Sequence, residues 1–195
     1  MKKDCLLCGV GGQGTVRASR IIALSGMEEG YNVKTAETIG MAQRGGSVVS
    51  HVRISDSKIW SPLIPKGAAD VLIAFEPAEA VRCLDFLKPD GAAIVNSRAV
   101  KPVEAMLGNS AYDGTECLEY LKKHVKNLRV IDGEEICRQC GSARVLNIVL
   151  LAGAAATGEL GISVDGLKDA IRRQLAPKYH EMNLRAVDLA AGNRA

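Results

Sequence analysis

Glycines spaced for anion binding stand near the start of the chain. Gly9, Gly11 and Gly14 follow the spacing G-x-G-x-x-G, directly after the short apolar run 5–8. Glycine permits the tight turn and the close backbone approach by which a strand passes directly into a helix. The unpaired backbone N–H groups at the start of that helix form a natural anion site. The pattern therefore predicts a ligand- or partner-facing turn made by Gly9, Gly11, Gly12, Gln13 and Gly14.

An acidic residue follows at a distance that suits a nucleotide. The next predicted strand, 31–36, leads into Glu37, which stands 23 residues after Gly14. Dinucleotide-binding folds place a ribose-binding acid about 20 residues beyond their glycines. One interpretation is therefore an oxidoreductase that binds NAD through 9–14 and Glu37. The other is that the glycines only pack a helix on a sheet, and the pattern leaves both open.

A polar, glycine-rich loop at 38–47 is a second candidate site. Gln43, Arg44 and Ser47 offer an amide, a guanidinium and a hydroxyl, and Gly45 and Gly46 free the backbone between them. These groups suit a carboxylate, a phosphate or the backbone of a partner protein. The alternative is an ordinary surface loop whose arginine is solvated.

The six cysteines allow a metal or redox site to be considered. Cys5 and Cys8 lie in a predicted strand, where a separation of three residues places their side chains on opposite faces. Cys137 and Cys140 share a face if 133–142 is helical, so a redox or metal pair there stays open. A second cysteine knuckle is missing, and we interpret the cysteines as small apolar residues of a protein in a reducing compartment.

Composition bounds the class of protein. The chain has 195 residues, of which 47% are hydrophobic and 24% charged, and a formal net charge of +3. This fits one α/β domain spanning 1–195. With 4% aromatic residues and no basic block, no nucleic-acid partner is expected. The longest apolar run, 145–156, is too short to cross a bilayer and no apolar signal segment opens the chain, so we expect no membrane partner and a cytoplasmic protein.

The order of predicted elements indicates an α/β fold. The run 71–75 is apolar throughout, as in a parallel strand covered on both faces, and a helix from Pro77 through Leu87 and a strand at 92–95 complete a βαβ unit. Val48–Ile54 alternates as a strand, with 58–61 as a returning hairpin arm. Helices follow at 144–157, after Ser163 and after Pro177. We therefore predict a Rossmann-like three-layer domain with a mostly parallel sheet and a C-terminal helical segment. Its ligands should gather at the carboxyl ends of the strands.

One buried amide needs a function in this arrangement. Asn147 stands among small apolar residues in the predicted helix 144–157 and has four hydrogen-bonding positions to satisfy. It either ties down a loop or faces a partner.

Several motifs together resemble one known family. Gly9–Gly14, the stretch 37–48 with Gln-Arg-Gly-Gly-Ser, the stretch 69–77 ending in Glu-Pro, Asn147, and Asn183-Leu-Arg-Ala186 occur in the same order across nearly the whole chain. They resemble the gamma-type subunit of 2-oxoacid:ferredoxin oxidoreductases, and most closely the small-subunit type of the indolepyruvate enzymes. The chain departs from the pattern at 135–141, where relatives tend to carry small or acidic residues.

The resemblance implies a function shared with other subunits. The family oxidises a 2-oxoacid with coenzyme A to an acyl-CoA, carbon dioxide and reduced ferredoxin. Thiamine diphosphate, Mg and 4Fe–4S clusters are expected on a large partner subunit, and none is expected on this chain alone. The chain would cap the partner's active site with the two glycine-rich stretches and Glu37. Pyruvate, ketoisovalerate and 2-oxoglutarate remain alternatives to an aryl pyruvate. A homodimer of the isolated chain and contact with coenzyme A stay open.

Overall fold

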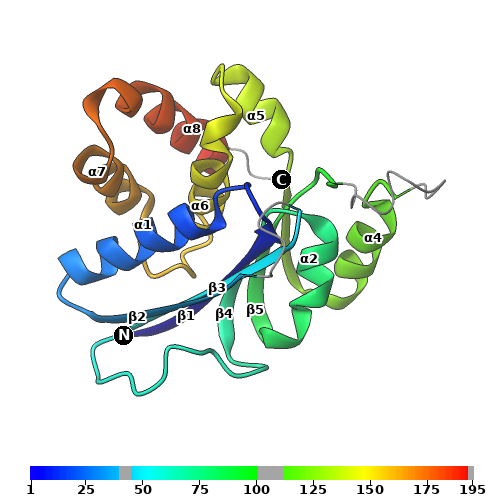
Figure 1. Cartoon of the computed structure of the whole chain (residues 1–195), viewed down its shortest axis with the longest axis horizontal. Coiled ribbons are helices and arrows are strands. Elements are labelled where there is room, and N and C mark those ends of the chain that lie inside the picture. Colours follow the sequence, from blue (N-terminus) through cyan, green and yellow to red (C-terminus); the bar gives the residue numbers. More distant parts are fainter. Residues whose placement is uncertain (40–44, 101–111, 193–195) are drawn as a thin grey trace.

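A six-stranded sheet in the order β2-β3-β1-β4-β5-β6 runs through the computed structural model, which describes residues 1–39, 45–100 and 112–192 (Figure 1). Strand β1 pairs in parallel with β4, β4 with β5, and β5 with β6, whereas β3 is antiparallel to both of its neighbours. The predicted α/β fold with a mostly parallel sheet is confirmed. The strands are β1 (Lys2–Val10), β2 (Asn32–Ile39), β3 (Ser47–Ser55), β4 (Ala69–Ala74), β5 (Leu87–Asn96) and β6 (Asn127–Ile131).

Helices cover both faces of the sheet and make the outer layers (Figure 1). One layer holds α1 (Thr15–Glu28), α5 (Gly133–Gln139), α6 (Leu146–Ala155), α7 (Val164–Gln174) and α8 (His180–Gly192). The other face is covered by α2 (Pro77–Arg82) and α4 (Thr115–His124). Short 3-10 turns at Leu84–Phe86, Ala143–Val145 and Pro177–Tyr179 connect these elements.

The alternation of side chains along β1 divides the core in two. Cys5 and Leu7 pack under α1 and α6, whereas Leu6 and Cys8 pack toward α2 and α4. Both sets are essentially inaccessible to solvent, which explains the unbroken apolar run of this strand. The prediction that Cys5 and Cys8 lie on opposite faces is confirmed, and the two thiols cannot bind one metal ion together.

Helix starts in the second half follow the capping signals of the sequence. The Ser163 hydroxyl accepts a hydrogen bond from the Gly166 N–H, and the Asp132 carboxylate accepts one from the Glu135 N–H. Each bond satisfies a backbone donor that the first helical turn leaves unpaired. The helix predicted after Ser163 therefore begins where the sequence places it, and 133–139 is helical, as the shared face of Cys137 and Cys140 requires.

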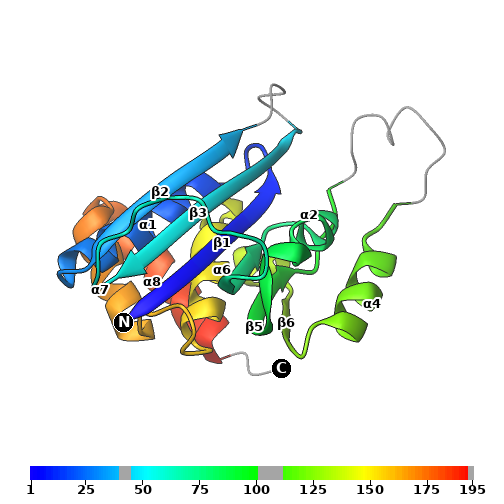
Figure 2. The ribbon, with the colours of Figure 1, turned by 90° about the horizontal axis from the view of Figure 1, so that it is seen from below.

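The returning hairpin arm predicted at 58–61 is wrong. The segment 56–68 contains no strand, and it crosses the face of β2, β3 and β1 that α1 does not cover (Figure 2). It is held there because His51 Nδ1 accepts a hydrogen bond from the Ile64 N–H at 3.2 Å. His51 is consequently structural, and burial lowers the pKa of its imidazole.

The helix predicted from Pro77 through Leu87 is also shorter than expected. It ends at Arg82, and Leu87 already belongs to β5, where it pairs with Ala69 of β4. Pairing in the sheet thus overrides the helical spacing of the apolar residues. Most of the connection from β5 to α4 lies outside the described residues.

Strand β3 separates the two strands on which the nucleotide prediction depended. The connection from β2 returns the chain antiparallel, and β3 pairs with β2 on one side and β1 on the other. Strands lie about 4.8 Å apart, so β2 is about twice that distance from β1. Among the described residues no helix is long and apolar enough to cross a membrane.

We predict that Gly9→Ala destabilises the fold. A Cβ at Gly9 would stand 2.8 Å from Phe75 Cβ and 2.7 Å from Gln13 Oε1, and such overpacking costs about 1–3 kcal/mol. Urea unfolding should show this loss. The matched control is Gly192→Ala in α8. A Cβ built on Gly192 meets no other part of the chain within 4 Å, so this variant should be neutral or stabilising. Equal stability of the Gly9→Ala and Gly192→Ala variants would contradict the close packing at Gly9.

Candidate functional site

Two glycine-rich segments meet at the carboxyl edge of the sheet. The Gly11 N–H donates to the Gly46 carbonyl at 2.9 Å and joins the turn after β1 to the start of β3. Gly9, Gly11, Gly12, Gln13 and Gly14 thus lie beside Gly45, Gly46 and Ser47. Gln43 and Arg44, which were also predicted for this site, lie outside the described residues.

The exposed part of this edge is backbone. Gly12 and Gly45 are exposed and adopt positive φ angles of 100° and 80°. Only glycine adopts such angles without strain, and a Cβ on Gly12 would have no atom within 4 Å. The turn therefore offers peptide groups and an unobstructed surface to whatever approaches it.

Gln13 does not face outward. Its Oε1 accepts from the Val10 N–H at 2.7 Å, and its Nε2 donates to the Phe75 carbonyl at 3.1 Å. The side chain therefore ties the end of β1 to the end of β4. A partner- or ligand-facing role for this amide does not fit its geometry, and its function in the chain is to shape the turn.

A second amide completes the connection across the edge. Asn96, at the end of β5, donates from Nδ2 to the same Phe75 carbonyl at 3.2 Å. Its Oδ1 accepts from the Gly133 N–H at the start of α5 at 3.2 Å. The two amides thus lock the ends of β1, β4 and β5 to one another and to α5.

Two buried glutamates support the start of β3 and the segments beside it. Glu79 is 5% exposed, accepts a hydrogen bond from the Ser47 hydroxyl and forms an ion pair with Arg82 at 3.2 Å. Glu76 is 2% exposed and caps α2 by accepting from the Glu79 N–H at 3.0 Å. Both carboxylates have partners within the chain, so their arrangement indicates support of the edge and not acid–base catalysis.

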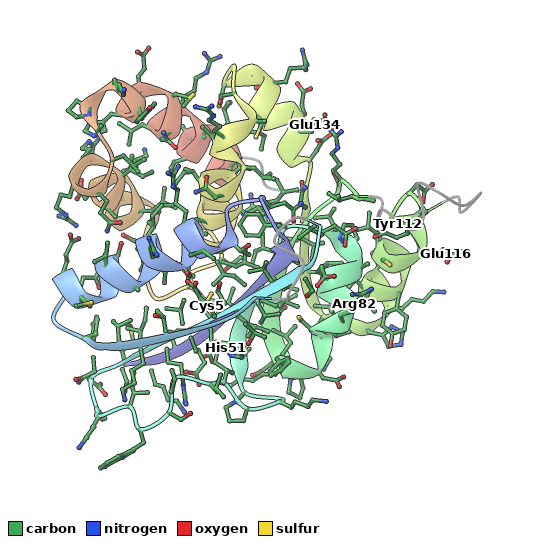
Figure 3. The ribbon with its side chains drawn as sticks, viewed as in Figure 1. Cys5, His51, Arg82, Tyr112, Glu116 and Glu134 are labelled. Atoms are coloured by element: carbon green, nitrogen blue, oxygen red, sulfur yellow. The ribbon has the colours of Figure 1, made fainter. Side chains whose placement is uncertain are left out.

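Tyr112, which precedes α4, contacts Glu76 at the start of α2. Its hydroxyl donates to Glu76 Oε1, which also accepts from the Val100 N–H at 3.4 Å. Figure 3 shows Tyr112 with Arg82 on the side of the molecule that carries α2 and α4. Burial, and next the adjacent Glu76 carboxylate, raise the pKa of the Tyr112 phenol far above its usual value.

The geometry of Glu37 does not support the nucleotide interpretation. Its Oε1 accepts from the Ser19 hydroxyl of α1 at 3.3 Å, and its strand is separated from β1 by β3. In a dinucleotide site the acidic residue and the glycines end neighbouring strands. Glu37 therefore does not lie beside the glycine turn, as a ribose-binding acid would have to.

The cysteines do not fit an iron–sulfur cluster. All six are free, and the described residues contain no group of three or more His, Cys, Asp or Glu that could hold a metal. Burial raises the pKa of the Cys137 thiol to about 11 and also raises that of Cys140. A thiolate is the form that binds metal or attacks a disulfide, so both thiols are poorly suited to either function at neutral pH.

Comparison with known proteins decides the family. The family described as pyruvate ferredoxin/flavodoxin oxidoreductase matches residues 4–192. The chain belongs to this family. It is 38% identical over 190 residues to the indolepyruvate oxidoreductase subunit IorB of Archaeoglobus fulgidus, with 97% of this chain and 94% of that protein covered. It is 28% identical to the pyruvate/ketoisovalerate oxidoreductases common subunit gamma of Pyrococcus furiosus, with 91% and 89% covered.

Solved structures of this family share the fold. The pyruvate oxidoreductase subunit PORC of Thermotoga maritima has a TM-score of 0.72 at 19% identity, with 98% of this chain and 96% of that chain covered. The 2-oxoglutarate:ferredoxin oxidoreductase of Magnetococcus marinus has a TM-score of 0.73 at 20% identity, and the match covers 30% of that chain. Family membership makes the present chain a subunit of a 2-oxoacid:ferredoxin oxidoreductase, an enzyme that acts on an oxo group with an iron–sulfur protein as acceptor.

Sequence reasoning missed two residues, Glu79 and Tyr112, that support the glycine-rich edge. Glu79 was detectable, because Glu76, Pro77 and Glu79 occupy the N-cap, first and third positions of α2. Tyr112 gave no signal, because it follows a long connection and carries no periodicity. The direction of the Gln13 amide was likewise not encoded in any local spacing.

We predict that Tyr112→Phe destabilises the domain by about 1–3 kcal/mol at neutral pH. The change leaves a buried carboxylate oxygen of Glu76 with one donor fewer. The raised pKa keeps Tyr112 protonated in the fold, while an unfolded tyrosine ionises near pH 10. The stability that depends on the protonated phenol is therefore present below pH 10 and is lost as the pH rises above it.

The difference between wild type and Tyr112→Phe should consequently shrink above pH 10 in urea unfolding. Tyr120→Phe, on the exposed side of α4, is the control and should follow the wild type. A Tyr112→Phe difference that stays constant from pH 7 to 11 would contradict the buried hydrogen bond.

Proposed function

We propose that this chain is the small subunit of an indolepyruvate or aryl pyruvate:ferredoxin oxidoreductase and that it caps the active site of a thiamine-bearing partner. The observation that carries the proposal is the 38% identity to the Archaeoglobus subunit along nearly the whole chain. The enzyme would convert the oxoacid and coenzyme A to an acyl-CoA and carbon dioxide, with two electrons passed to ferredoxin. Thiamine diphosphate, Mg and 4Fe–4S clusters would be supplied by the large partner, because the cysteines described here do not fit a cluster.

The capping surface of the proposal is the carboxyl edge. Gly12 and Gly45 expose backbone there, and Gly11 and Gly46 hold the two segments together. Protein surfaces that pack closely on a reaction site benefit from such small residues, because a partner's backbone can approach them without steric conflict. β2 ends at Ile39 beside Val48 of β3, and Arg44 directly precedes Gly45 in the sequence, so the Arg44 guanidinium is our candidate for an anionic group of the partner, the substrate or coenzyme A.

The inward direction of the Gln13 amide decides which residues of the edge are proposed to contact a ligand. Since Gln13 supports the turn, its contribution to capping is indirect, through the position of Gly11 and Gly12. The same holds for Ser47, whose hydroxyl is committed to Glu79. Ligand contact is accordingly proposed for the exposed glycines and Arg44, and positioning for Gln13 and Ser47.

The choice among substrates follows the relatives. Identity falls from 38% with the indolepyruvate subunit to 28% with a common gamma subunit named for pyruvate and ketoisovalerate. An aryl pyruvate is therefore our proposed substrate, with pyruvate, ketoisovalerate and 2-oxoglutarate as the alternatives that a substrate panel must include.

A stand-alone NAD oxidoreductase is disfavoured by the strand order. β3 stands between β1 and β2, and Glu37 bonds to Ser19 of α1. The proposal therefore expects the isolated chain to bind no dinucleotide and to have little activity.

We predict that a tagged form of the chain, purified anaerobically from its native cells, retains a large partner that carries thiamine and iron. The complex should reduce a dye with indolepyruvate faster than with pyruvate, ketoisovalerate or 2-oxoglutarate. Thiamine and iron analysis and the dye assay give the result. A chain that is recovered alone and binds NAD would overturn the capping proposal, whereas a complex that prefers pyruvate would overturn only the substrate.

We predict that Arg44→Ala lowers turnover of the assembled enzyme or partner affinity at least tenfold. A charge-assisted contact at an interface is worth about 1.5–3 kcal/mol, which corresponds to a factor of about ten or more. Arg172→Ala is the matched control, since it removes the same charge from α7, where Arg172 pairs with Asp169 at 2.8 Å. If the Arg44→Ala and Arg172→Ala variants had equal partner affinity and equal turnover, the proposed role of Arg44 would be wrong.

A further inference from the structure

A cavity lies on the other flank of α1 from Glu37. It has a volume of about 270 Å³ and is lined by residues of α1, α6 and α8 and of the turns that precede α6 and α8. Arg17 and Ile21 of α1 face it, and each is about 200° around the helix from Ser19, which faces β2. The cavity is thus on the side of α1 away from β2 and Glu37. Its lining is Arg17, Ile21, Arg144, Asn147, Ile148, Leu175, Tyr179, Met182 and Asn183.

The start of α1 and the first turns of α6 and α8 lie beside this cavity. Arg17, Asn147 and Met182 belong to the first turns of α1, α6 and α8, respectively. α1 has no side-chain cap and no acidic residue in its first turn, whereas α6 and α8 each continue a 3-10 turn, so the Leu146 N–H donates to the Ala143 carbonyl and the His180 N–H to the Pro177 carbonyl. Glu181 in the first turn of α8 is exposed and does not line the cavity. The aligned N–H groups and dipoles at helix starts favour an anion.

The Asn147 amide points to a ligand independently of the helices. Asn147 is 4% exposed and has no hydrogen bond to any residue of the ranges that the structure describes. Its Cβ lies 3.6 Å from a Cβ built on Gly14, so the side chain sits between the starts of α1 and α6. The amide lines the cavity and is open to it, so a bound group could accept its N–H bonds in place of water. Of the two functions expected for Asn147, facing a partner molecule fits this geometry.

The charges around the opening are unpaired cations. Arg17 and Arg144 are exposed and form no ion pair within the described part of the chain. Arg20 and Gln174 extend the same groove along α1, and the Gln174 Nε2 is buried without a hydrogen-bond partner. Guanidinium groups bind carboxylate and phosphate through paired hydrogen bonds.

The rest of the lining is apolar and held in place. Ile21, Ile148 and Leu175 form apolar wall, with Met182 and Tyr179 beside them. The Tyr179 carbonyl accepts from Asn183 Nδ2 at 2.7 Å, and the Leu175 carbonyl bonds to His180 Nε2 at 2.8 Å. These bonds fix the wall before any ligand arrives, which reduces the entropy cost of binding.

We propose that this cavity binds a small molecule with an anionic head and an apolar body. The head lies between Arg17, Arg144 and the Asn147 amide, and the body lies against Ile21, Leu175 and Tyr179. Carboxylate and phosphate share this head chemistry. The site is on this chain alone, so it goes beyond the capping function and does not require the partner subunit.

The test is titration of the isolated full-length chain by calorimetry and by amide NMR. Phenylacetate and phenyl phosphate are the two anionic probes, phenylacetamide is the neutral probe, and inorganic phosphate is the anion without an apolar body. We expect the better anionic probe to bind with a Kd on the order of a millimolar or tighter, at least tenfold tighter than either comparison probe. It should also shift the side-chain amide signals of Asn147. The stronger of the two anionic probes identifies the head group.

Variants locate the binding. Arg17→Ala and Arg144→Ala should each raise the Kd of the better anionic probe at least fivefold, and phenylacetamide should bind them as it binds the wild type. Arg172→Ala is the control of equal charge and should leave every Kd unchanged. Thermal melting confirms that each variant is folded, which the exposure of these arginines favours. No saturable anion binding below 10 mM, anion binding no tighter than that of phenylacetamide or inorganic phosphate, or a Kd unaffected in both arginine variants would overturn the proposal.

Discussion

The carbonyl of Phe75 is the point on which the carboxyl edge of the sheet depends. It accepts hydrogen bonds from Gln13 at the end of β1 and from Asn96 at the end of β5. A carbonyl has two lone pairs, so two amides satisfy it fully, and each amide uses its oxygen to hold a further backbone N–H. The turn after β1, the start of α5 and two strand ends are therefore fixed together. The exposed glycine backbone of this edge is therefore held rigidly from beneath.

The antiparallel strand β3 separates this fold from a dinucleotide-binding domain with the same glycine spacing. It occupies the position beside β1 that the second parallel strand would otherwise take. The same strand brings the Gly46 carbonyl within hydrogen-bonding distance of the Gly11 N–H, and its Ser47 hydroxyl donates a hydrogen bond to Glu79. The strand order thus removes the ribose-binding geometry and brings the two glycine-rich segments together.

Residues with local signals were predictable from the sequence, and residues that act across the fold were not. The apolar runs of β1 and β4, the cap at Ser163 and the opposite faces of Cys5 and Cys8 follow from periodicity over a few residues. The end of α2 was misplaced because Leu87 satisfies both a helical spacing and a strand pairing with Ala69, and only the folded sheet decides between them. The inward direction of Gln13 depends on Phe75, 62 residues away. The supporting contact of Tyr112 with Glu76 spans 36 residues, and no local pattern contains it.

Helix α1 organises both surfaces for which we infer a function. Its start leaves the glycine turn on one flank, toward Gly46, and the Arg17 cavity on the other, toward Asn147. One flank exposes backbone without side chains, whereas the other gathers guanidinium and amide donors around an apolar wall. Gly14 connects the two, because its φ of 93° starts the helix without a side-chain cap and brings the backbone close to Asn147. An uncapped helix start is costly unless something else accepts its N–H groups. The position of Asn147 and the two arginines beside that start is therefore best explained by an anion that serves as the missing cap.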